Sequence, residues 1–397
     1  MVILFGCLSL LVSCLGIYSN YKKKNLILYI WVICAYYCIT SLVAINSPQN
    51  IYIMNSTKII YMFNLLSCIA SFYVCDLLFN KKNISNVSFS FTHYEKIFKI
   101  LELIYWISYI LTFLELRTLD YWTYVSQGGA GWAQVFYIST SGVIYYYCYK
   151  KKWLKISISL ILMLLIIAST GVRSLLYYIV MPIGFYYLHK ILHTSRSIGG
   201  FIMKILPFAV LLIISVLVVN MLRFGYVDLP ETELTIIALR CLEYWNEGNQ
   251  YFNSVNHYML GFLVPINNIM TKFDIYWLDY MDLLFPSIPK LNALILLGAT
   301  DVSQIGATHM PSTIFYNLYI SWGNYAFIAS FVTYWFFLKF FSFFQANNLR
   351  ILLFSPMFGW HFYMIMRGAS DGASRGIAYS ILICLIIYYI IFKRIKN

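Results

Sequence analysis

The sequence predicts an all-α polytopic integral membrane protein, and three observations lead to that class. Hydrophobic residues make up 61% of the 397-residue chain and charged residues only 11%, whereas soluble domains contain about 45–50% apolar and about 25% charged residues. Apolar runs of roughly 20 residues, the length that crosses a bilayer as a helix, recur along the chain. The charged residues gather between these runs. We therefore expect a single membrane domain over residues 1–397 with about eleven transmembrane helices.

Short loops separate most of the predicted spans. The spans cover residues 1–19, 26–45, 57–79, 97–116, 132–149, 153–169, 174–192, 201–222, 313–341, 351–366 and 376–392. The first run is interpreted as a retained span rather than a cleavable signal, because its lysines follow the apolar stretch instead of preceding it. The one long loop, residues 223–311, lies between the eighth and ninth spans. A long loop on an otherwise compact membrane protein is usually functional.

Lysine marks one side of the predicted membrane domain. Lys22–Lys24, Lys150–Lys152 and the segment KRIK at residues 393–396 all fall on that side. Cytoplasmic loops carry an excess of positive residues. The N-terminus is therefore expected outside and the C-terminus in the cytoplasm.

Arginine, by contrast, is concentrated on the opposite, outer side. The outer arginines are Arg117, Arg173, Arg223, Arg240, Arg367 and Arg375. Arg173, in the segment STGVRS, is the most unusual, because it stands between two apolar runs, where a charge is costly. Arginine binds phosphate and carboxylate groups in a bidentate manner. Arg173, Arg223, Arg240, Arg367 and Arg375 are therefore candidate ligands for an anionic group at the outer interface, with pairing to outer carboxylates as the alternative.

The large loop carries a second group of candidate residues. In RFGYVDLPETELTIIALRCLEYWNEGNQYF, which starts at Arg223, the residues Arg240, Glu243 and Glu247 are spaced i, i+3 and i+7 and share one face of a predicted helix. That face either holds an ordinary ion pair between Arg240 and Glu243 or is turned towards a substrate. The loop closes with THMPSTIFYNLYISWGN, in which His309 stands just before the ninth span.

The order of these features resembles the Wzy-class O-antigen and capsular oligosaccharide repeat-unit polymerases. The resemblance rests on STGVRS, on Arg240 in the large loop and on THMPSTIFYNLYISWGN leading into the next span. It implies a GT-C-like fold in the bacterial cytoplasmic (inner) membrane. It also implies that a growing glycan is transferred from undecaprenyl diphosphate to a lipid-linked repeat unit at the outer face. The implied partners are undecaprenyl-diphosphate-linked glycans, the lipid bilayer, a chain-length regulator and a flippase.

The chemistry of that transfer gives roles to the candidate residues. Undecaprenyl diphosphate leaves with growing negative charge, and preplaced arginines stabilise that charge in the transition state. Neither a metal nor another cofactor is therefore expected. The attacking sugar hydroxyl needs a general base. The candidates are His309, Glu243 and Glu247, with Asp301 and Asp228 as further options, and His309 and Glu243 are preferred.

Other functions are also compatible with the sequence. An O-antigen ligase of the same superfamily would share the arginines and the outer loop. A flippase or transporter for lipid-linked oligosaccharides is a third hypothesis, although transporters tend to place polar residues deep in the bundle. A membrane acyltransferase using His361 or His309 is a fourth. Nucleic-acid binding is not expected, because the net charge of +13 comes mostly from lysines that set topology.

Overall fold

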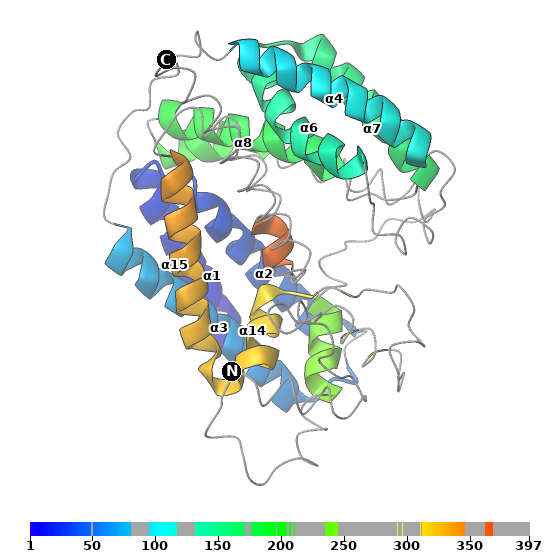
Figure 1. The fold of residues 1–397 in the computed structure, drawn as a ribbon. Coiled ribbons are helices and arrows are strands. Elements are labelled where there is room, and N and C mark those ends of the chain that lie inside the picture. The colour runs from blue at the N-terminus through cyan, green and yellow to red at the C-terminus, as the bar shows by residue number, and fades with distance from the viewer. Residues whose placement is uncertain are drawn as a thin grey trace. The chain divides into compact units, whose positions relative to one another are not determined.

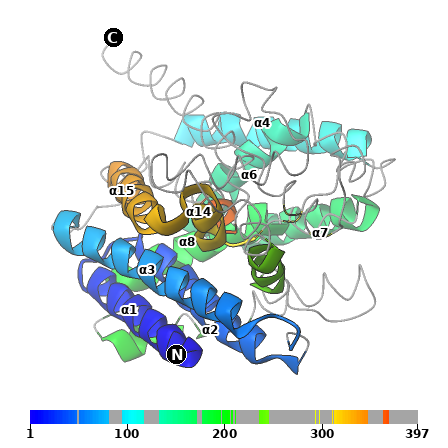
Figure 2. The same cartoon turned by 90° about the horizontal axis from the view of Figure 1, so that it is seen from below.

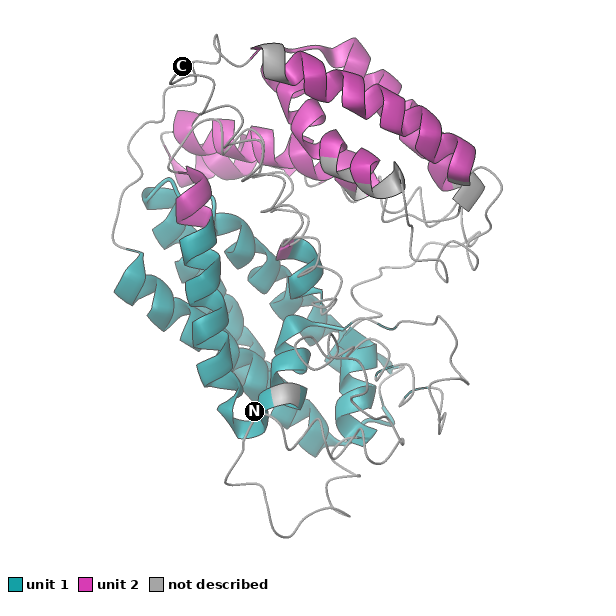
Figure 3. Cartoon of the chain, in the orientation of Figure 1, with its two compact units in different colours: residues 1–83, 229–340, 363–373 teal, residues 84–228, 341–362, 374–397 magenta. Residues whose placement is uncertain are grey.

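The computed structural model is helical, and no strand occurs in the part of the chain that it describes. That part comprises residues 1–48, 51–80, 95–116, 132–170, 176–195, 197–204, 206–207, 210, 235–244, 292, 296, 310, 312–345 and 362–367. The chain forms two compact units (Figure 3). Unit 1 holds residues 1–83, 229–340 and 363–373, and unit 2 holds residues 84–228, 341–362 and 374–397. The expectation of one membrane domain stays a prediction.

Four helical segments in the described part are long and apolar enough to cross a membrane, and all of them lie wholly or mainly in unit 1 (Figure 1). They are α1 (Val2–Lys22), α2 (Leu28–Asn46), α3 (Asn55–Phe79) and the segment Gly323–Gln345. Their lengths of 19 to 25 residues correspond to roughly 28–38 Å of helix, which matches a hydrocarbon core of about 30 Å. These helices are long and apolar enough for the predicted membrane class, and α1, α2 and α3 begin and end within a few residues of the first three predicted spans.

Helix α1 packs against α2 and α3 through small side chains rather than large ones. Its buried positions include Gly6, Ser9, Ser13 and Gly16, and the serine hydroxyls donate to carbonyls one turn back, Ser9 to Phe5 at 2.8 Å and Ser13 to Ser9 at 2.9 Å. The large apolar residues of α1 are exposed instead: Ile3, Leu4, Leu8, Leu11 and Leu15. Small residues inside and large apolar residues outside are the arrangement that a lipid environment favours.

Two glycines allow α1 to approach its neighbours closely. A Cβ atom at Gly16 would lie 2.2 Å from the ring of Trp31 in α2. A Cβ atom at Gly6 would lie 2.3 Å from Leu42, also in α2, and 2.7 Å from Met62 in α3. Contacts this short do not occur between real carbon atoms, so a side chain at Gly16 would have to displace the rigid Trp31 ring, whereas one at Gly6 would have to displace the side chains of Leu42 and Met62.

The predicted ninth span, 313–341, is not one helix. It consists of α14 (Ile314–Trp322), a 3-10 turn, η5 (Gly323–Tyr325), and α15 (Ala326–Gln345). Gly323 has φ 55 and ψ −128, a conformation that favours glycine and ends α14. Asn64 of α3 donates to the Phe315 carbonyl at 2.9 Å, and the Cys68 thiol one turn later lies 4.0 Å from the Ala326 carbonyl. Both ends of the α14–η5 segment are therefore held by a single turn of α3, and the crossing helix starts about ten residues later than predicted.

Unit 2 is built around a buried helix, α6 (Trp132–Tyr149), which packs against α4 (Glu95–Leu116) and α8 (Tyr177–Thr194) (Figure 2). The segment Val143–Cys148 of α6 is almost completely buried. The rings of Phe98 and Tyr146 stack at 4.4 Å across the α4–α6 interface. Helix α7 (Trp153–Thr170) contacts both α4 and α6. The residue limits of these four helices agree within a few residues with the predicted spans 97–116, 132–149, 153–169 and 174–192.

One face of α4 is apolar and exposed. It carries Ile100, Leu103, Ile104, Ile107, Ile110 and Leu114, which recur at the spacing of a single helix face. Water would not stabilise such a surface, whereas lipid does. The predicted span 376–392 and most of the predicted spans 201–222 and 351–366 lie outside the described residues.

Helices α1 and α6 end in the same way, with lysine at a position that usually holds glycine. Lys24 and Lys151 both have φ 54 and are the non-glycine residues with positive φ in the described part. Around Lys24, the amide of Asn25 donates to the Asn20 carbonyl at 3.0 Å and that of Lys24 to the Tyr21 carbonyl at 3.1 Å. These two bonds define the Schellman C-cap, whose left-handed residue is normally glycine because another side chain costs roughly 1 kcal/mol there. The bonds recur after α6, from Lys152 to Tyr147 and from Lys151 to Cys148.

Candidate functional site

The predicted site residues in the described part are Arg240, Glu243 and Arg367. Those outside it are Arg173, Arg223, Arg375, Glu247 and His309, together with Asp228, Asp301 and His361. All of these assignments stay predictions. Arg367 is partly buried at the end of the helical segment 362–367, where its amide donates to the Tyr363 carbonyl at 2.9 Å.

Arg240 stands on a helix that unit 1 holds firmly. Residues 235–244 are helical, within the helix predicted for this part of the large loop. Ala238, Leu239, Cys241 and Leu242 are buried, whereas Arg240 is exposed. The buried side anchors the helix, so the guanidinium extends from a fixed backbone.

Glu243 is engaged with the backbone of another segment. Its Oε1 accepts a hydrogen bond from the amide of Met54 at 3.2 Å, at the start of α3. The positive end of a helix stabilises a carboxylate at that position. Among the described residues no ion pair joins Arg240 to Glu243, so the ordinary surface pair considered from the sequence is not formed.

A group of buried hydroxyls surrounds Tyr61 of α3 and includes one residue of the large loop and one residue just after it. The Tyr61 hydroxyl lies 3.4 Å from Ser41 Oγ and beside Thr235 and Thr313. Thr235 lies in the helical segment 235–244. Thr313 caps α14, accepting from the amide of Tyr316 at 3.3 Å. All four hydroxyl-bearing residues are buried, so the predicted outer segments meet at one end of α2 and α3.

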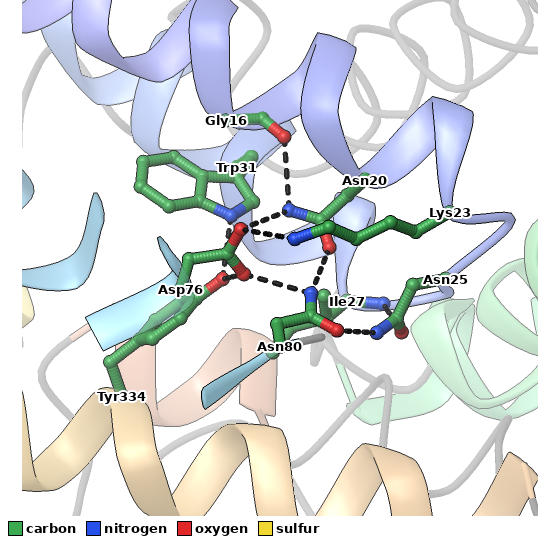
Figure 4. Close-up of polar contacts among 9 residues, drawn as sticks. All are labelled: Gly16, Asn20, Lys23, Asn25, Ile27, Trp31, Asp76, Asn80 and Tyr334. Atoms are coloured by element: carbon green, nitrogen blue, oxygen red, sulfur yellow. Dashed lines mark hydrogen bonds and ion pairs between the residues drawn. The ribbon is translucent and has the colours of Figure 1, made fainter. Parts of the chain in front are cut away.

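A second polar site, which was not predicted from the sequence, surrounds Asp76 near the other end of α3 (Figure 4). Asp76 is fully buried. Its Oδ1 accepts from Tyr334 at 2.8 Å and from Asn80 Nδ2 at 3.0 Å. Its Oδ2 accepts from Asn20 Nδ2 at 3.2 Å and lies 3.6 Å from Lys23 Nζ.

Further bonds close this network. Asn80 Nδ2 also donates to Asn20 Oδ1 at 2.7 Å, and Asn25 Nδ2 donates to Asn80 Oδ1 at 3.1 Å. Trp31 Nε1 donates to the Tyr334 hydroxyl at 2.6 Å. The network thus links α1, α2, α3 and α15 through one carboxylate. A buried polar network of this kind stabilises one arrangement of its helices when every member is paired.

The Asp76 network carries a charge but presents no free ligand. Both carboxylate oxygens are occupied, and no group of three or more potential metal-binding acids, cysteines or histidines occurs within the described ranges. A signal for this site does exist in the sequence: Asn20, Asn25 and Asn80 all fall at the ends of spans predicted to lie on one side. A single carboxylate near the end of an apolar run resembles a loop charge, which is why Asp76 was missed.

Unit 2 has its own charged end. Glu102 of α4 accepts from the Tyr147 hydroxyl at 2.7 Å and pairs with Lys155. Glu95 pairs with Lys150. The hydrogen bond from Lys150 lowers the pKa of the Glu95 carboxyl, and the same bond raises the pKa of the Lys150 ammonium. The charges at this end are therefore locally balanced in part, while Lys151 stays exposed.

Comparisons with known proteins add no relative. No protein-family model, curated protein or solved structure matches this chain.

Proposed function

We propose that the chain is a GT-C-like membrane glycosyltransferase with about eleven spans, of the Wzy class of oligosaccharide repeat-unit polymerases. It would transfer a growing glycan from undecaprenyl diphosphate to a lipid-linked repeat unit at the outer face of the bacterial cytoplasmic membrane. The observation that supports this proposal is the setting of Arg240. This arginine is exposed on an anchored helix of the large loop and is not paired with the nearby Glu243.

An anchored arginine suits the chemistry of this transfer. The bond between the donor sugar and the diphosphate breaks as the acceptor hydroxyl attacks, and the diphosphate gains charge. A guanidinium already in place stabilises that charge without reorganisation. Arg173, Arg223, Arg367 and Arg375 are proposed to share this role, and the undecaprenyl chain would lie in the bilayer beside them.

The acceptor hydroxyl transfers its proton to a general base, for which His309, Glu243 and Glu247 were predicted. Glu243 Oε1 accepts a hydrogen bond from the Met54 amide, and the second oxygen of a carboxylate can still accept a proton. His309 and Glu243 therefore stay the preferred bases. Alanine at the true base is expected to abolish turnover while binding of the lipid-linked donor persists.

The test is the surface-glycan profile of a strain that lacks this gene, complemented with wild type, Arg240→Ala, Arg240→Lys or Tyr244→Ala. Tyr244 is an exposed side chain on the same helix and serves as the matched control. If the protein is a polymerase, strains complemented with wild type or Tyr244→Ala should show a ladder of glycan lengths. The strain with Arg240→Ala should show only single repeat units at an equal level of the protein. Arg240→Lys should restore the ladder only in part, because lysine cannot bind phosphate in a bidentate manner. An unchanged ladder in the deletion strain excludes this function.

The buried Asp76 network favours a second candidate, a flippase or transporter for lipid-linked oligosaccharides. Ionisable residues inside a membrane bundle are costly and commonly mark transport pathways. The two functions differ in what accumulates in the deletion strain. A missing flippase leaves repeat units on the inner leaflet, whereas a missing polymerase leaves single units on the outer leaflet. A ligase, the third alternative, leaves full-length polymer on its lipid carrier.

A further inference from the structure

The same four residues, Tyr-Lys-Lys-Lys, occur at the C-terminal ends of two helices, as residues 21–24 at the end of α1 and residues 149–152 at the end of α6. We call these segments the first and second lysine turns. They lie in different units, and both are predicted to face the cytoplasm. The structure gives them the same C-cap, with Lys24 and Lys151 in the left-handed position.

In each turn one lysine is held by a carboxylate from a neighbouring helix. Lys23 pairs with Asp76 of α3 in the first turn, and Lys150 pairs with Glu95 of α4 in the second. The side chain of Asn25, directly after the first turn, also holds this turn in place. Its Oδ1 accepts a hydrogen bond from the Ile27 amide at 3.0 Å, and its Nδ2 belongs to the Asp76 network. Each carboxylate therefore shapes its turn and leaves an excess of positive charge.

Tyrosine rings position other lysines of the turns. Lys22 Nζ lies 4.4 Å from the centre of the Tyr18 ring, and Lys24 Nζ lies 4.5 Å from that of Tyr21. In the second turn, Lys152 Nζ lies 5.3 Å from the centre of the Tyr146 ring. Cation–π contacts restrict a long side chain while its charge stays available. Lys24 is only partly exposed, and this partial burial lowers the pKa of its ammonium.

Membrane orientation alone does not explain this arrangement. Positive charge on the cytoplasmic side is sufficient for orientation, and its position within a loop is unimportant. Glycine or asparagine at the two C-cap positions would relieve backbone strain, and lysine at a neighbouring position would supply the same charge. Unfavourable backbone conformations of this kind persist mainly where a ligand or function requires them.

We propose that each lysine turn binds the phosphate headgroup of an anionic phospholipid in the cytoplasmic leaflet. The surfaces beside the turns suit the acyl chains of such a lipid. Leu11, Leu15 and Tyr18 of α1 are exposed next to the first turn, and Trp153, Leu154 and Ile158 of α7 are exposed next to the second. The lysines would hold the phosphate while these side chains contact the hydrocarbon. The proposal is independent of the reaction that the protein catalyses.

The experiment titrates the purified full-length protein in neutral detergent with phosphatidylglycerol and, separately, with phosphatidylcholine of the same acyl chains. Bound lipid is counted by native mass spectrometry. Wild type should retain phosphatidylglycerol in preference to phosphatidylcholine. Lys22→Gln and Lys152→Gln should each weaken phosphatidylglycerol binding about five-fold, the effect of one lysine at an anionic membrane surface. Lys58→Gln is the matched control and should have no effect, because Lys58 lies near the start of α3, at the end opposite to Asp76 and the first lysine turn.

A second pair of variants separates charge from backbone geometry. Lys24→Gly and Lys151→Gly keep the C-cap and relieve its strain, so the thermal midpoint should rise or stay constant while phosphatidylglycerol binding falls about five-fold. Unchanged phosphatidylglycerol binding in both glycine variants would overturn the proposal. Equal retention of the two lipids by wild type would overturn it as well.

Discussion

At the residue scale, Asp76 shows the limit of what could be predicted. Its type and position were visible, but the pairing of Asn20, Asn80 and Tyr334 around it depends on contacts between residues as much as 258 positions apart. Hydropathy records only that one polar residue interrupts an apolar run. Arg240 was easier to identify, because helical spacing separated it from the apolar residues of the same helix.

Tyr334→Phe is expected to destabilise unit 1 by about 1–3 kcal/mol, because Trp31 Nε1 loses its acceptor and Asp76 loses a donor inside the bundle. Thermal unfolding of the purified protein in detergent measures this change. Tyr325→Phe is the matched control, since Tyr325 is 39% exposed. An equal midpoint for the two variants would show that the Tyr334 hydroxyl does not stabilise the fold.

Asp76→Asn is expected to cost more, about 3–5 kcal/mol, because it removes the negative partner of Lys23 and directs an amide group towards other donors. The same unfolding measurement applies. Combining Asp76→Asn with Lys23→Gln should cost less than the sum of the two single changes. Each single change leaves the other charged group without its partner, whereas the double variant removes both charges. Strict additivity would mean that the 3.6 Å contact contributes nothing.

At the element scale, helices α1 to α4 and α6 to α8 were predicted to within a few residues, because polar or charged residues that bound apolar runs mark helix ends well. The break at Gly323 was missed, since hydropathy continues through it without interruption. Its signal was the sequence Trp322-Gly323-Asn324, in which the glycine can adopt the positive φ that ends α14. The small-residue face of α1 was likewise not predicted, because the average hydropathy of a segment does not show which face of the helix carries the large side chains.

Gly16→Ala tests the α1–α2 contact. The added methyl group would lie 2.2 Å from Trp31, so we expect a loss of about 1–3 kcal/mol from forced repacking. Gly184→Ala in α8 is the control, because its Cβ would meet nothing within 4 Å and alanine improves helix propensity by about 1 kcal/mol. A stabilising effect of both substitutions would contradict the close approach.

The Glu95–Lys150 pair gives unit 2 a small pH dependence. The folded pKa of Glu95 is lowered, so its contribution is complete above the unfolded value of about 4.3 and is lost as the pH falls through the folded value. The folded pKa of Lys150 is raised, so its contribution is complete below about 10.4 and is lost as the pH rises through the folded value. Wild type should therefore exceed Glu95→Gln in thermal midpoint at neutral pH and converge with it in acid. Glu115→Gln, an exposed change on the same helix, should show no such convergence.

At the scale of the whole molecule, the sequence predicted the membrane class, because composition alone excludes a soluble fold. It could not show how the outer arginines are arranged, since Arg173, Arg223 and Arg375 are far apart in the chain and only contacts between elements would bring them together. Within unit 1 the predicted sides are consistent. Glu243, Met54 and Thr313 meet at one end, and Lys23, Asn25 and Asn80 at the other.

Orientation can be tested directly. Ser47→Cys should react with an impermeant maleimide in intact spheroplasts, whereas Lys151→Cys should react only after the membrane is opened. Wild type, which carries its native cysteines, gives the background. The reverse pattern would place the lysine turns outside, contradicting both the predicted topology and the cytoplasmic leaflet as the source of the lipid.

The glycines of α1 also restrict how the protein can move. If α1 slid by one turn along α2 and α3, Ser13 or Asn20 would face Trp31 in place of Gly16, and neither side chain fits where a Cβ atom alone would lie 2.2 Å from the ring. The three N-terminal helices therefore have a single register and no sliding freedom. Any rearrangement of unit 1 that keeps these contacts must leave this register intact and take place in its other elements.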